Sequence, residues 1–483
     1  TRPLHVREAG EDLRAADALL GRLGLADGRE SLAASEDRLR RMGDVLDSLT
    51  ISRASIDGGE DGSGGGGSGG GEGLRASFAA SLAASLAGST LSEYLTGWGI
   101  DDSVFASRIR NCDGRAFFNT VQVVEDAFQV DWGRCSATKR FPKFFELNDK
   151  AIKAGTRTVQ QELSRTAAEL RSGYLLLVGT YQYYVSKSGL VQGQESATLS
   201  MTKNTYHRFL QDLVPADRAG DLGLNQDLHR VFVTVNLEEG SSVENEVNLD
   251  NAIMRHEWLE AAVRIAWILF KGDPRAEGSP GRCVGLLAAR LHARLPAACA
   301  ADPDAYRAAR LYRPEVAQVL SRHQHLLDAI YKVYKLRAES RQQGSEWKNL
   351  KGFFKVSMRQ NFSISDMDQV FVRANVYSET FTRNDAKLLF MWSQMMVQDE
   401  LLCRQRVISL GFVDFLEVLC RVADARASGS LVDYQGELAE NLEVFLRHLF
   451  HHLAVFHNGI LRVNCRGSQM DGKILASLEA YLN

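Results

Sequence analysis

Four histidines near the end of the chain have the spacing of metal ligands. His448 and His451 are three residues apart, and His448 and His452 are four residues apart. On a helix, both spacings place two imidazoles on one face, where they can reach a zinc ion. A further ligand would have to come from His457 or Cys465. The alternative is a helix face that is partly exposed or packs against acidic neighbours. We favour this alternative, so the sequence predicts no metal-binding residue and no cofactor.

Two pairs of carboxylates occur at a spacing of three residues. They are Glu257 with Glu260, and Asp414 with Glu417. Two carboxylates can act together in a hydrolase, but on an amphipathic helix such a pair more often forms a solvated face. An arginine, Arg264 or Arg421, follows four residues after the second carboxylate of each pair. This Glu-to-Arg order stabilises a helix by about 0.2–0.5 kcal/mol. We therefore expect both pairs to be solvated and to have a structural role.

A short basic and aromatic stretch raises the possibility of nucleic-acid binding. Lys139, Arg140 and Lys143 surround Phe141 and Phe144. The alternative is that the aromatic rings belong to the core and the lysine stems lie along them. The whole chain has 57 Lys and Arg against 60 Asp and Glu, a net charge of −3. This balance is unlike that of a nucleic-acid binder, so we predict no nucleic-acid partner.

Sequence signatures of common enzymes are missing. Between Gly58 and Gly73, 11 of 16 residues are glycine. A phosphate-binding loop would need a following Lys-Ser or Lys-Thr between a strand and a helix, which this stretch lacks. The sequence also contains no H-E-x-x-H pair and no protein-kinase signature. We predict a protein that is not an enzyme. An enzyme with an unrecognised site would need a buried polar cluster in a cleft, with perturbed pKa values.

The composition is that of a helical globular protein. Hydrophobic residues make up 45% and charged residues 24% of the chain, and its eight prolines favour long helices. The longest apolar stretches, Tyr174–Val185 and Leu259–Phe270, are too short to span a bilayer. The seven cysteines are widely spaced, which is typical of a reducing compartment. We expect a cytoplasmic protein without a membrane partner. Because the first residue is Thr1, we also expect the chain to be a fragment.

The N-terminal part has the pattern of a helical arm on a flexible tether. A heptad-like seam runs through Leu32, Leu39, Met42, Leu46 and Leu49. A helix packed on its own domain would explain this seam, and so would an arm that docks on a partner. The glycine-rich residues 58–73 that follow are expected to be a flexible linker. The tether favours the docking arm, because a linker keeps a tethered helix close to its partner.

Two long segments of the chain match each other in order. The matching pairs are Leu175–Tyr184 with Leu326–Lys335, Leu199–Thr202 with Phe362–Ser365, Asp227–Phe232 with Asp385–Phe390, and His256–Ala266 with Val413–Ala423. Their offsets are 151, 163, 158 and 157 residues. The kept order predicts a duplicated helical module. Within the second copy, Ser363 with Asp366 and Thr382 with Asp385 have the spacing of helix-capping pairs.

The predicted organisation follows from these patterns. It is an N-terminal helical arm at 1–57, a linker at 58–73, a helical unit at 74–170, a first module at 171–270, a connector at 271–324, a second module at 325–424 and C-terminal helices at 425–483. The C-terminal helices resemble the start of a further module. The predicted fold class is all-α.

The pattern within each module resembles a degenerate pair of EF-hands. Its last element reads Gly411–Ala423 in the second copy and Met254–Ala266 in the first. It is similar to the EF-hand-like domain of tubulin polymerisation-promoting proteins and to helical modules of ciliary and flagellar axonemal proteins. The resemblance covers Leu175–Ala423. It implies tandem EF-hand-like helical domains in a cilium or flagellum axoneme, or in another part of the cytoskeleton.

The loops lack the ligands that calcium needs. An EF-hand loop alternates oxygen ligands, turns at a central glycine and ends on a bidentate glutamate. The acidic residues of the stretch Val235–Leu249 are Glu238, Glu239, Glu244 and Glu246, and they do not alternate in this way. The stretch Gln398–Ser409 has Asp399 and Glu400, followed by two arginines. We therefore predict modules that keep the EF-hand packing without the metal.

These observations together lead to one functional expectation. The resemblance implies a non-enzymatic structural or adaptor protein of a microtubule-associated assembly, with other protein subunits, including tubulin, as partners. Helical grooves and the tethered arm would bind them. The candidate contact residues are Tyr181, Tyr183, Tyr184, Trp347 and Trp392, unless they belong to the core. The alternative function is a calcium-regulated signalling adaptor in a soluble complex.

Overall fold

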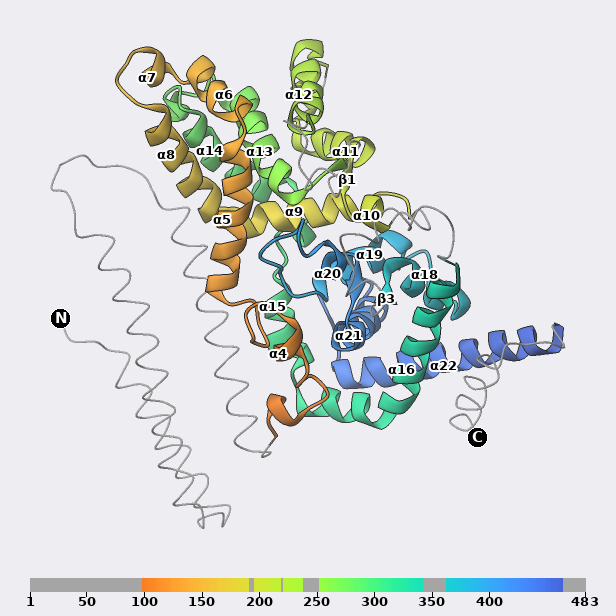
Figure 1. Ribbon diagram of the computed structural model, residues 1–483. Helices are drawn as coiled ribbons and strands as arrows, with labels where there is room; N and C mark the ends of the chain where they lie inside the picture. The colour runs from red at the N-terminus through yellow and green to blue at the C-terminus, as the bar shows by residue number, and fades with distance from the viewer. Residues whose placement is uncertain (1–97, 191–194, 219, 238–251, 342–361, 464–483) are drawn as a thin grey trace, which may run out of the picture. The chain divides into compact units, whose positions relative to one another are not determined.

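The computed structural model describes residues 98–190, 195–218, 220–237, 252–341 and 362–463 (Figure 1). The chain divides into two compact units, Thr1–Gly69 and Gly70–Asn483, and every described residue belongs to the second. The boundary between the units falls within the glycine-rich residues 58–73. The predicted arm at 1–57, that glycine-rich stretch and the first part of the unit at 74–170 lie outside the described residues.

The described part of the chain has an all-α fold, as the sequence predicted. Before the first repeat come η1 (Ile100–Asp102), α4 (Arg108–Asn111), α5 (Val121–Ala137), α6 (Arg140–Asn148), α7 (Lys150–Lys153) and α8 (Val159–Ser172). The first repeat consists of α9 (Tyr174–Ser186), α10 (Glu195–Thr198), β1 (Met201–Thr202), α11 (Lys203–Leu213), η2 (Ala216–Arg218), α12 (Leu222–Val235), β2 (Ala252–Ile253) and α13 (Arg255–Phe270).

The second half continues with helices of the same kind. Between the repeats lie η4 (Pro274–Ala276), α14 (Pro280–Arg294), η5 (Ala297–Ala300), α15 (Pro303–Tyr306) and the π-helical turn η6 (Arg307–Leu311). The second repeat consists of α16 (Pro314–Arg341), β3 (Phe362–Ser363), α18 (Ile364–Arg373), α19 (Arg383–Trp392), α20 (Arg404–Val407), β4 (Ser409–Leu410) and α21 (Phe412–Ser428), and α22 (Leu438–Val463) follows it. The strands are only two residues long.

The same arrangement occurs in both repeats. In each, the two short strands pair antiparallel, β1 with β2 and β3 with β4. A tyrosine of the first helix then donates a hydrogen bond to a backbone oxygen of the second strand. Tyr181 reaches the oxygen of Ile253 at 3.1 Å, and Tyr331 reaches that of Leu410 at 2.9 Å. These repeated contacts identify equivalent positions independently of the sequence pattern.

The repeated contacts correct two of the predicted sequence pairings. Met201 pairs with Ile253, and Phe362 pairs with Leu410, so Met201 and Phe362 are equivalent at an offset of 161 rather than 163. The two tyrosines are equivalent at an offset of 150 rather than 151. Short segments cannot show where an insertion falls, whereas strand pairing fixes the register. The last helices begin 157 residues apart, as predicted.

Side chains at the helix starts explain why several helices begin where they do. Ser363 accepts a hydrogen bond from the backbone N–H of Asp366, and Thr382 accepts one from that of Asp385. Each aspartate in turn accepts from the backbone N–H of its cap residue. Both predicted capping pairs are therefore confirmed. Such caps satisfy backbone donors that the first helical turn leaves without partners.

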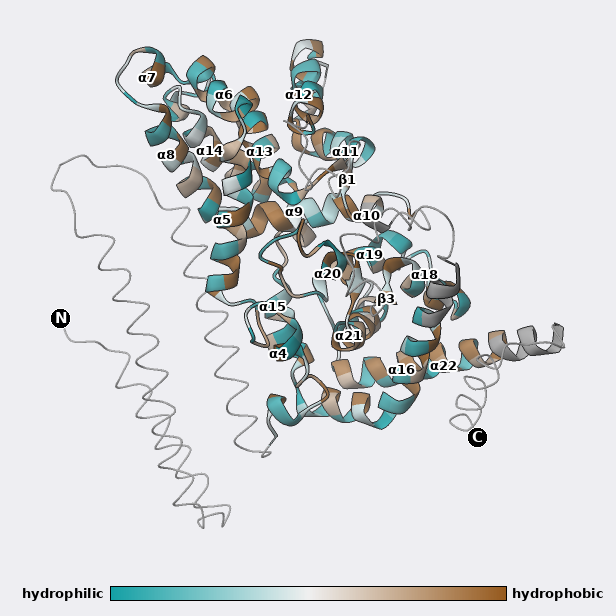
Figure 2. Ribbon diagram, viewed as in Figure 1, coloured by the Kyte–Doolittle hydropathy of each residue, from teal (hydrophilic) through white to brown (hydrophobic). Residues whose placement is uncertain are grey.

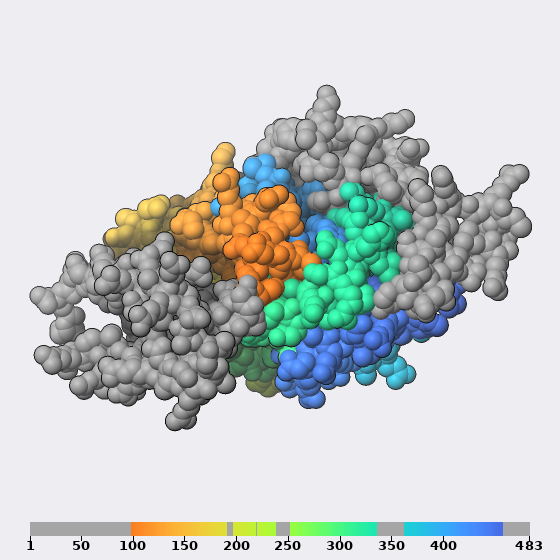
Figure 3. All heavy atoms as spheres, turned by 90° about the horizontal axis from the view of Figure 1, so that it is seen from below, coloured from red at the N-terminus to blue at the C-terminus, as the bar shows by residue number. Residues whose placement is uncertain are grey.

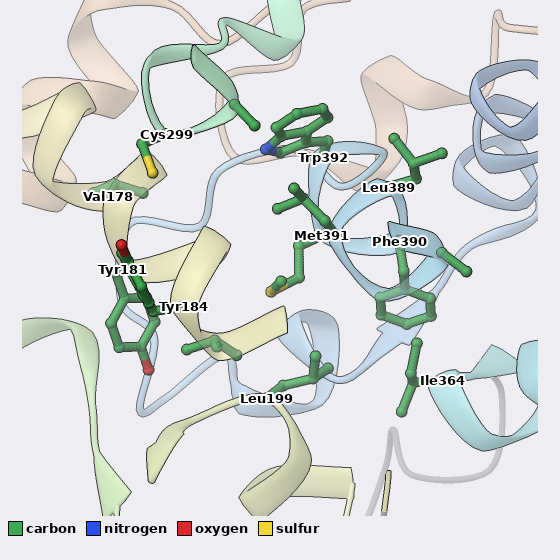
Figure 4. Packing of buried hydrophobic residues seen from close by; sticks show 14 of the residues in the cluster. Val178, Tyr181, Tyr184, Leu199, Cys299, Ile364, Leu389, Phe390, Met391 and Trp392 are labelled. Carbon is green, nitrogen blue, oxygen red and sulfur yellow. The ribbon is translucent and has the colours of Figure 1, made fainter. Parts of the chain in front are cut away.

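The two repeats share one hydrophobic core. Helix α9 of the first repeat packs against α11 and α13 of its own repeat, against η5 and against α19 of the second repeat. Figure 4 shows Val178 and Tyr184 of α9 in the same packed region as Met391 and Trp392 of α19. Figure 2 shows hydrophobic residues along α9 and α21 and hydrophilic residues on α4. Helix α9 is therefore buried from several sides.

The residues predicted as a connector, 271–324, pack against both repeats. Helix α14 packs against α13 of the first repeat and against α8, and Arg307 of η6 contacts Glu417 of the second repeat. Helix α16, expected from about residue 325, already begins at Pro314. On another face, Tyr312 packs edge-on against Phe105, Phe117 and Phe118. Figure 3 shows this region from below, with the orange residues that follow position 98 beside green residues.

A glycine in α9 allows η5 to approach closely, which predicts the effect of one substitution. A Cβ atom at Gly179 would lie 2.3 Å from the backbone oxygen of Cys299, closer than real contacts allow. We expect Gly179→Ala to lower the free energy of unfolding by about 1–3 kcal/mol, because the backbone must shift. Chemical denaturation measures this change.

Gly133 is the matched control. It lies in α5, and nothing approaches within 4 Å of a Cβ at that position. Gly133→Ala should raise the free energy of unfolding by up to about 1 kcal/mol through helix propensity. Equal effects of the two substitutions would contradict the close approach of η5.

Candidate functional site

Three of the four paired carboxylates are buried, so the predicted solvated face is wrong for them. Glu260 is 1% exposed, Glu417 is fully buried and Glu257 is also buried, whereas the side chain of Asp414 is 22% exposed. The sequence pattern missed this because other elements cover the polar face of each helix. Helix α13 is covered by α5 and α14. The polar face of α21 meets arginines from α4 and η6.

Glu417 is the centre of a buried charged network, which we call the Glu417 cluster. Its carboxylate contacts Arg108 at 2.6 Å, Arg307 at 3.0 Å and Arg421 at 2.7 Å. Each of these arginine side chains is at most 1% exposed. Of the three, only Arg421 belongs to the same helix as Glu417. The favourable spacing of Glu417 and Arg421 is thus used in a buried network, where charges interact far more strongly than on a surface.

Further carboxylates complete the network. Arg307 contacts Asp304 at 2.6 Å, and Arg310 contacts Asp424 at 2.7 Å. The hydroxyl of Tyr306 donates to Asp424 at 3.2 Å. The cluster comprises four arginines and four carboxylates: Arg108, Arg307, Arg310, Arg421, Asp304, Asp414, Glu417 and Asp424. Balanced charge and many hydrogen bonds are what a buried ionic group requires.

Electrostatics keep Glu417 ionised. Burial by itself would raise the pKa of its carboxyl, but Arg307, Arg108 and Arg421 outweigh burial and lower that pKa to about 2. Burial also raises the pKa of Asp414, against the attraction of Arg108. Asp414 accepts from the backbone N–H of Gly411 at 3.1 Å. The two carboxylates of this predicted pair thus have different environments.

Glu260 of the first repeat is bound in the same way as Glu417. It contacts Arg264 of its own helix at 2.8 Å and Arg140 of α6 at 3.2 Å. Arg140 also donates to the backbone oxygen of Val235 at 2.8 Å. In both repeats, therefore, the glutamate of the last helix binds one arginine four residues later and another from outside the repeat. This equivalence is a tertiary feature that the sequence pattern could not show.

The predicted basic and aromatic stretch is divided by the fold. Phe141 and Phe144 are buried, so their rings are not available to stack on bases. Arg140 is bound to Glu260, whereas Lys139 and Lys143 are exposed. The alternative interpretation, core aromatics with lysines at the surface, agrees with this arrangement.

The loop before β4, predicted as a degenerate calcium loop, is bound by arginines. Arg404 contacts Glu400 at 2.5 Å, and the backbone N–H of Arg255 donates to the same carboxylate at 2.9 Å. The Arg255 side chain donates to the backbone oxygens of Val397 and Gln398, both at 3.1 Å. The first helix residue of α13 thus holds the loop of the second repeat, and Glu400 is already occupied.

The neighbouring carboxylates of this interface are paired as well. Asp399 contacts Arg134 of α5 at 2.8 Å. Arg255 contacts Asp131 of α5 at 2.6 Å, and the hydroxyl of Tyr174 donates to Asp131 at 2.7 Å. The loop, α5 and α13 are therefore joined by one continuous set of ion pairs.

A buried lysine makes a further contact between the repeats. The side chain of Lys387, in α19, is 2% exposed. Its ammonium donates to the backbone oxygen of Ser188 at 3.2 Å and to the Ser188 hydroxyl. Ser188 lies in the loop after α9. Burial lowers the pKa of Lys387 to about 7.

The histidines lie together on α22 but do not form a zinc site in the described residues. The rings of His448 and His452 are 4.3 Å apart between centroids. His448 Nε2 lies 3.2 Å from the backbone oxygen of Asn375, and burial lowers the pKa of His448. No three His, Cys, Asp or Glu side chains among the described residues are grouped to hold a metal ion. The His457 side chain and Cys465 lie outside the described residues.

Most of the candidate contact aromatics belong to the core. Tyr181, Tyr184 and Trp392 are buried, and Tyr183 is partly buried. Trp347 lies outside the described residues. The core alternative therefore holds for Tyr181, Tyr184 and Trp392, which leaves them unavailable to a partner.

A groove of about 530 Å³ lies between α18 and α19. Phe371, Val372, Tyr377 and Arg383 are among its lining residues. None of the groove's lining residues belongs to the Glu417 cluster or to the ion pairs of the loop before β4.

No protein-family model, no curated protein and no solved structure matches this chain. Among the described residues, every helix is too short or too polar to cross a bilayer.

The Glu417 cluster predicts a large and pH-dependent effect of one substitution. Glu417→Gln leaves three arginines buried without their shared carboxylate, so we expect unfolding to become easier by about 3–5 kcal/mol. The folded pKa of about 2 lies below the ordinary value of 4.5. Ionised Glu417 therefore stabilises the protein above about pH 4.5, and this contribution is lost as the pH falls towards 2. Urea denaturation at several pH values measures the difference between variant and wild type.

Asp328→Asn is the control for Glu417→Gln. Asp328 forms an exposed pair with Lys332 on α16, and removing such a pair should change stability by less than about 1 kcal/mol. A Glu417→Gln effect as small as that of the control would show that the cluster does not stabilise the fold.

Lys387 predicts a trend at higher pH. Its folded pKa of about 7 lies below the ordinary 10.5, so the unfolded chain binds more protons between these values. The free energy of unfolding of the wild type, relative to that of Lys387→Met, should therefore increase as the pH rises from about 7 to about 10. Lys332→Met, at an exposed lysine, should show no such trend. A stability difference between Lys387→Met and wild type that does not change with pH would contradict the burial of an ionisable amine.

Proposed function

We propose that this chain is a non-enzymatic scaffold or adaptor of a ciliary or flagellar axoneme, or of another microtubule-based assembly. Its two repeats are EF-hand-like modules that hold protein contacts in place of calcium. The observation that carries the proposal is the occupation of the loop before β4 by arginines, which bind Asp399 and Glu400.

The order of elements supports the EF-hand-like part of the proposal. Each repeat contains two helix–loop–helix units in succession. The two short strands, one from each loop, pair with each other. This is the order that the sequence resemblance implies. The repeated tyrosine contact indicates that both copies keep the same packing.

The acidic residues at the helix starts also support a scaffold without metal. An EF-hand loop ends on a carboxylate ligand near the start of the following helix. Glu257, Asp366 and Asp414 occupy the third position of the helices that follow β2, β3 and β4. Each accepts from the backbone N–H three residues earlier, at 2.8, 2.9 and 3.1 Å. These carboxylates cap helices, a role that does not need a cation.

Cationic side chains replace the metal as the partners of the loops. Arg404 and Arg134 neutralise Glu400 and Asp399, and Lys387 binds the loop after α9. A calcium ion that competed for Glu400 would have to displace Arg404, which is itself buried. The loops thus hold the two repeats together, as expected of a scaffold whose shape does not depend on calcium.

The experiment that tests this function is affinity capture from ciliary axonemes. Full-length tagged chain is incubated with a salt extract of isolated axonemes, in a calcium chelator or in about 1 mM calcium, well above the range of sensor EF-hands. We expect the same axonemal or tubulin subunits to be captured in both conditions, because the loop carboxylates are occupied. Mass spectrometry identifies the subunits, and an unrelated helical protein of similar charge is the control.

Two outcomes would overturn parts of the proposal. Capture only in calcium, with a calcium-dependent shift in melting temperature, would favour the calcium-regulated adaptor. No cytoskeletal subunit above the control in either condition would remove the axonemal role.

A further inference from the structure

Exposed lysines lie along α6 and along α7. With Leu147 between them, Lys143, Lys150 and Lys153 form what we call the lysine stripe. Residues 143 and 147 are four apart and lie on one face of α6. Asp149, in an extended backbone conformation, separates α6 from α7, which carries residues 150 and 153. All four side chains are exposed, and Leu147 is 69% exposed. In Figure 1, α6 and α7 lie at the end of the layer formed with α8 and α14.

The surroundings of the stripe are positively charged, although the whole chain is not. Residues 139–171 contain eight basic and four acidic residues, whereas the chain has a net charge of −3. Two of those acids, Asp149 and Glu162, are buried and bound to Arg157 at 3.1 and 2.7 Å. Nearby Glu277 is paired with Arg282 at 2.5 Å. These carboxylates already have their own arginine partners.

The stripe lysines keep their charge for a partner from outside. Within the described ranges, no carboxylate forms an ion pair with Lys143, Lys150 or Lys153. Glu146 of α6 is exposed beside the stripe, but the stripe lysines outnumber it, so the net charge of this surface is positive. A row of cations this close together raises the local positive potential and attracts a complementary chain.

The backbone under the stripe is held firmly. Phe141, Phe144 and Phe145 anchor the inner face of α6 in the core. The backbone N–H of Lys150 donates to the oxygen of Gly278 at 3.2 Å, and the Lys150 stem covers that glycine. Gly278 has a φ of 70°, and a Cβ there would lie 2.5 Å from Lys150 Cδ, so this corner requires glycine. The lysines therefore start from fixed positions, which lowers the entropy lost on binding.

We propose that the lysine stripe binds an acidic segment of a partner polypeptide, with Leu147 as its apolar contact. Carboxylates along a peptide complement the positive charges of α6 and α7. An apolar side chain in that peptide would cover Leu147, whose side chain is 69% exposed among these lysines.

Two other anionic partners fit the surface less well. A nucleic acid would use aromatic rings to stack its bases, but the phenylalanines of α6 face the core. An amphipathic helix that inserts into an anionic membrane has a broad apolar face, whereas Leu147 is the one large apolar side chain in the stripe. The inference goes beyond the proposed function, because the purified chain can bind an acidic peptide whether or not it belongs to an axoneme.

Fluorescence anisotropy with a defined probe tests the inference. The probe is a labelled ten-residue glutamate peptide, and a second version carries one central leucine. Full-length chain should bind both, the leucine version more tightly, with affinity falling as NaCl rises from about 50 to about 300 mM. Lys143→Glu combined with Lys150→Glu should weaken binding at least about tenfold, because attraction becomes repulsion. Leu147→Ser should remove the preference for the leucine version.

The control reverses two exposed cations elsewhere. Lys203→Glu with Arg230→Glu changes the net charge equally, at α11 and α12, and should leave affinity within about twofold of wild type. Circular dichroism checks that each variant is folded. Unchanged binding by the stripe variant, or equal loss in both variants, would overturn the proposal. Tighter binding of a ten-nucleotide RNA or of phosphatidylserine vesicles at the stripe would also overturn it in favour of those partners.

Discussion

The fold depends on the burial of charge at Glu417. Removing a carboxylate and three guanidinium groups from water is costly, and only close pairing of all four groups offsets that cost. The arginines come from α4, η6 and α21, which are far apart in the sequence. The pairing therefore requires these three elements to meet in one arrangement. Loss of any one of them would leave the others charged and buried, so the ion pairs favour a single packing of the second repeat against the residues before it.

Buried charged contacts also join other parts of the molecule. Glu260 binds Arg140 of α6, and Arg255 links α5 to the loop of the second repeat. Lys387 reaches back to the loop after α9. The two repeats consequently share one core and are not separate domains. These loop carboxylates are paired within the protein, whereas the charged ends of the stripe lysines on α6 and α7 lie at its surface.

Part of this architecture follows from sequence patterns alone. The helical fold class, the duplication, the two capping pairs and the offset of the last helices all rest on local chemistry or on repetition along the chain. The register of the first two matching pairs was wrong by one and two residues, because the loops between them differ in length. The capping residues Ser363 and Thr382 were predictable because a cap acts on a backbone group only three residues away.

The sequence by itself determined which residues carry charge and where α18 and α19 begin, and it placed Glu260 with Arg264 and Glu417 with Arg421. Only the tertiary structure decided that these pairs are buried. Helical periodicity reports which face of a helix is polar, but it does not report whether another element covers that face. For α21 the covering arginines come from positions 108 and 307, and no pattern within the helix contains them. The local sequence likewise could not predict the partners of the carboxylates in the loop before β4, because Arg134, the partner of Asp399, lies 265 residues away in sequence.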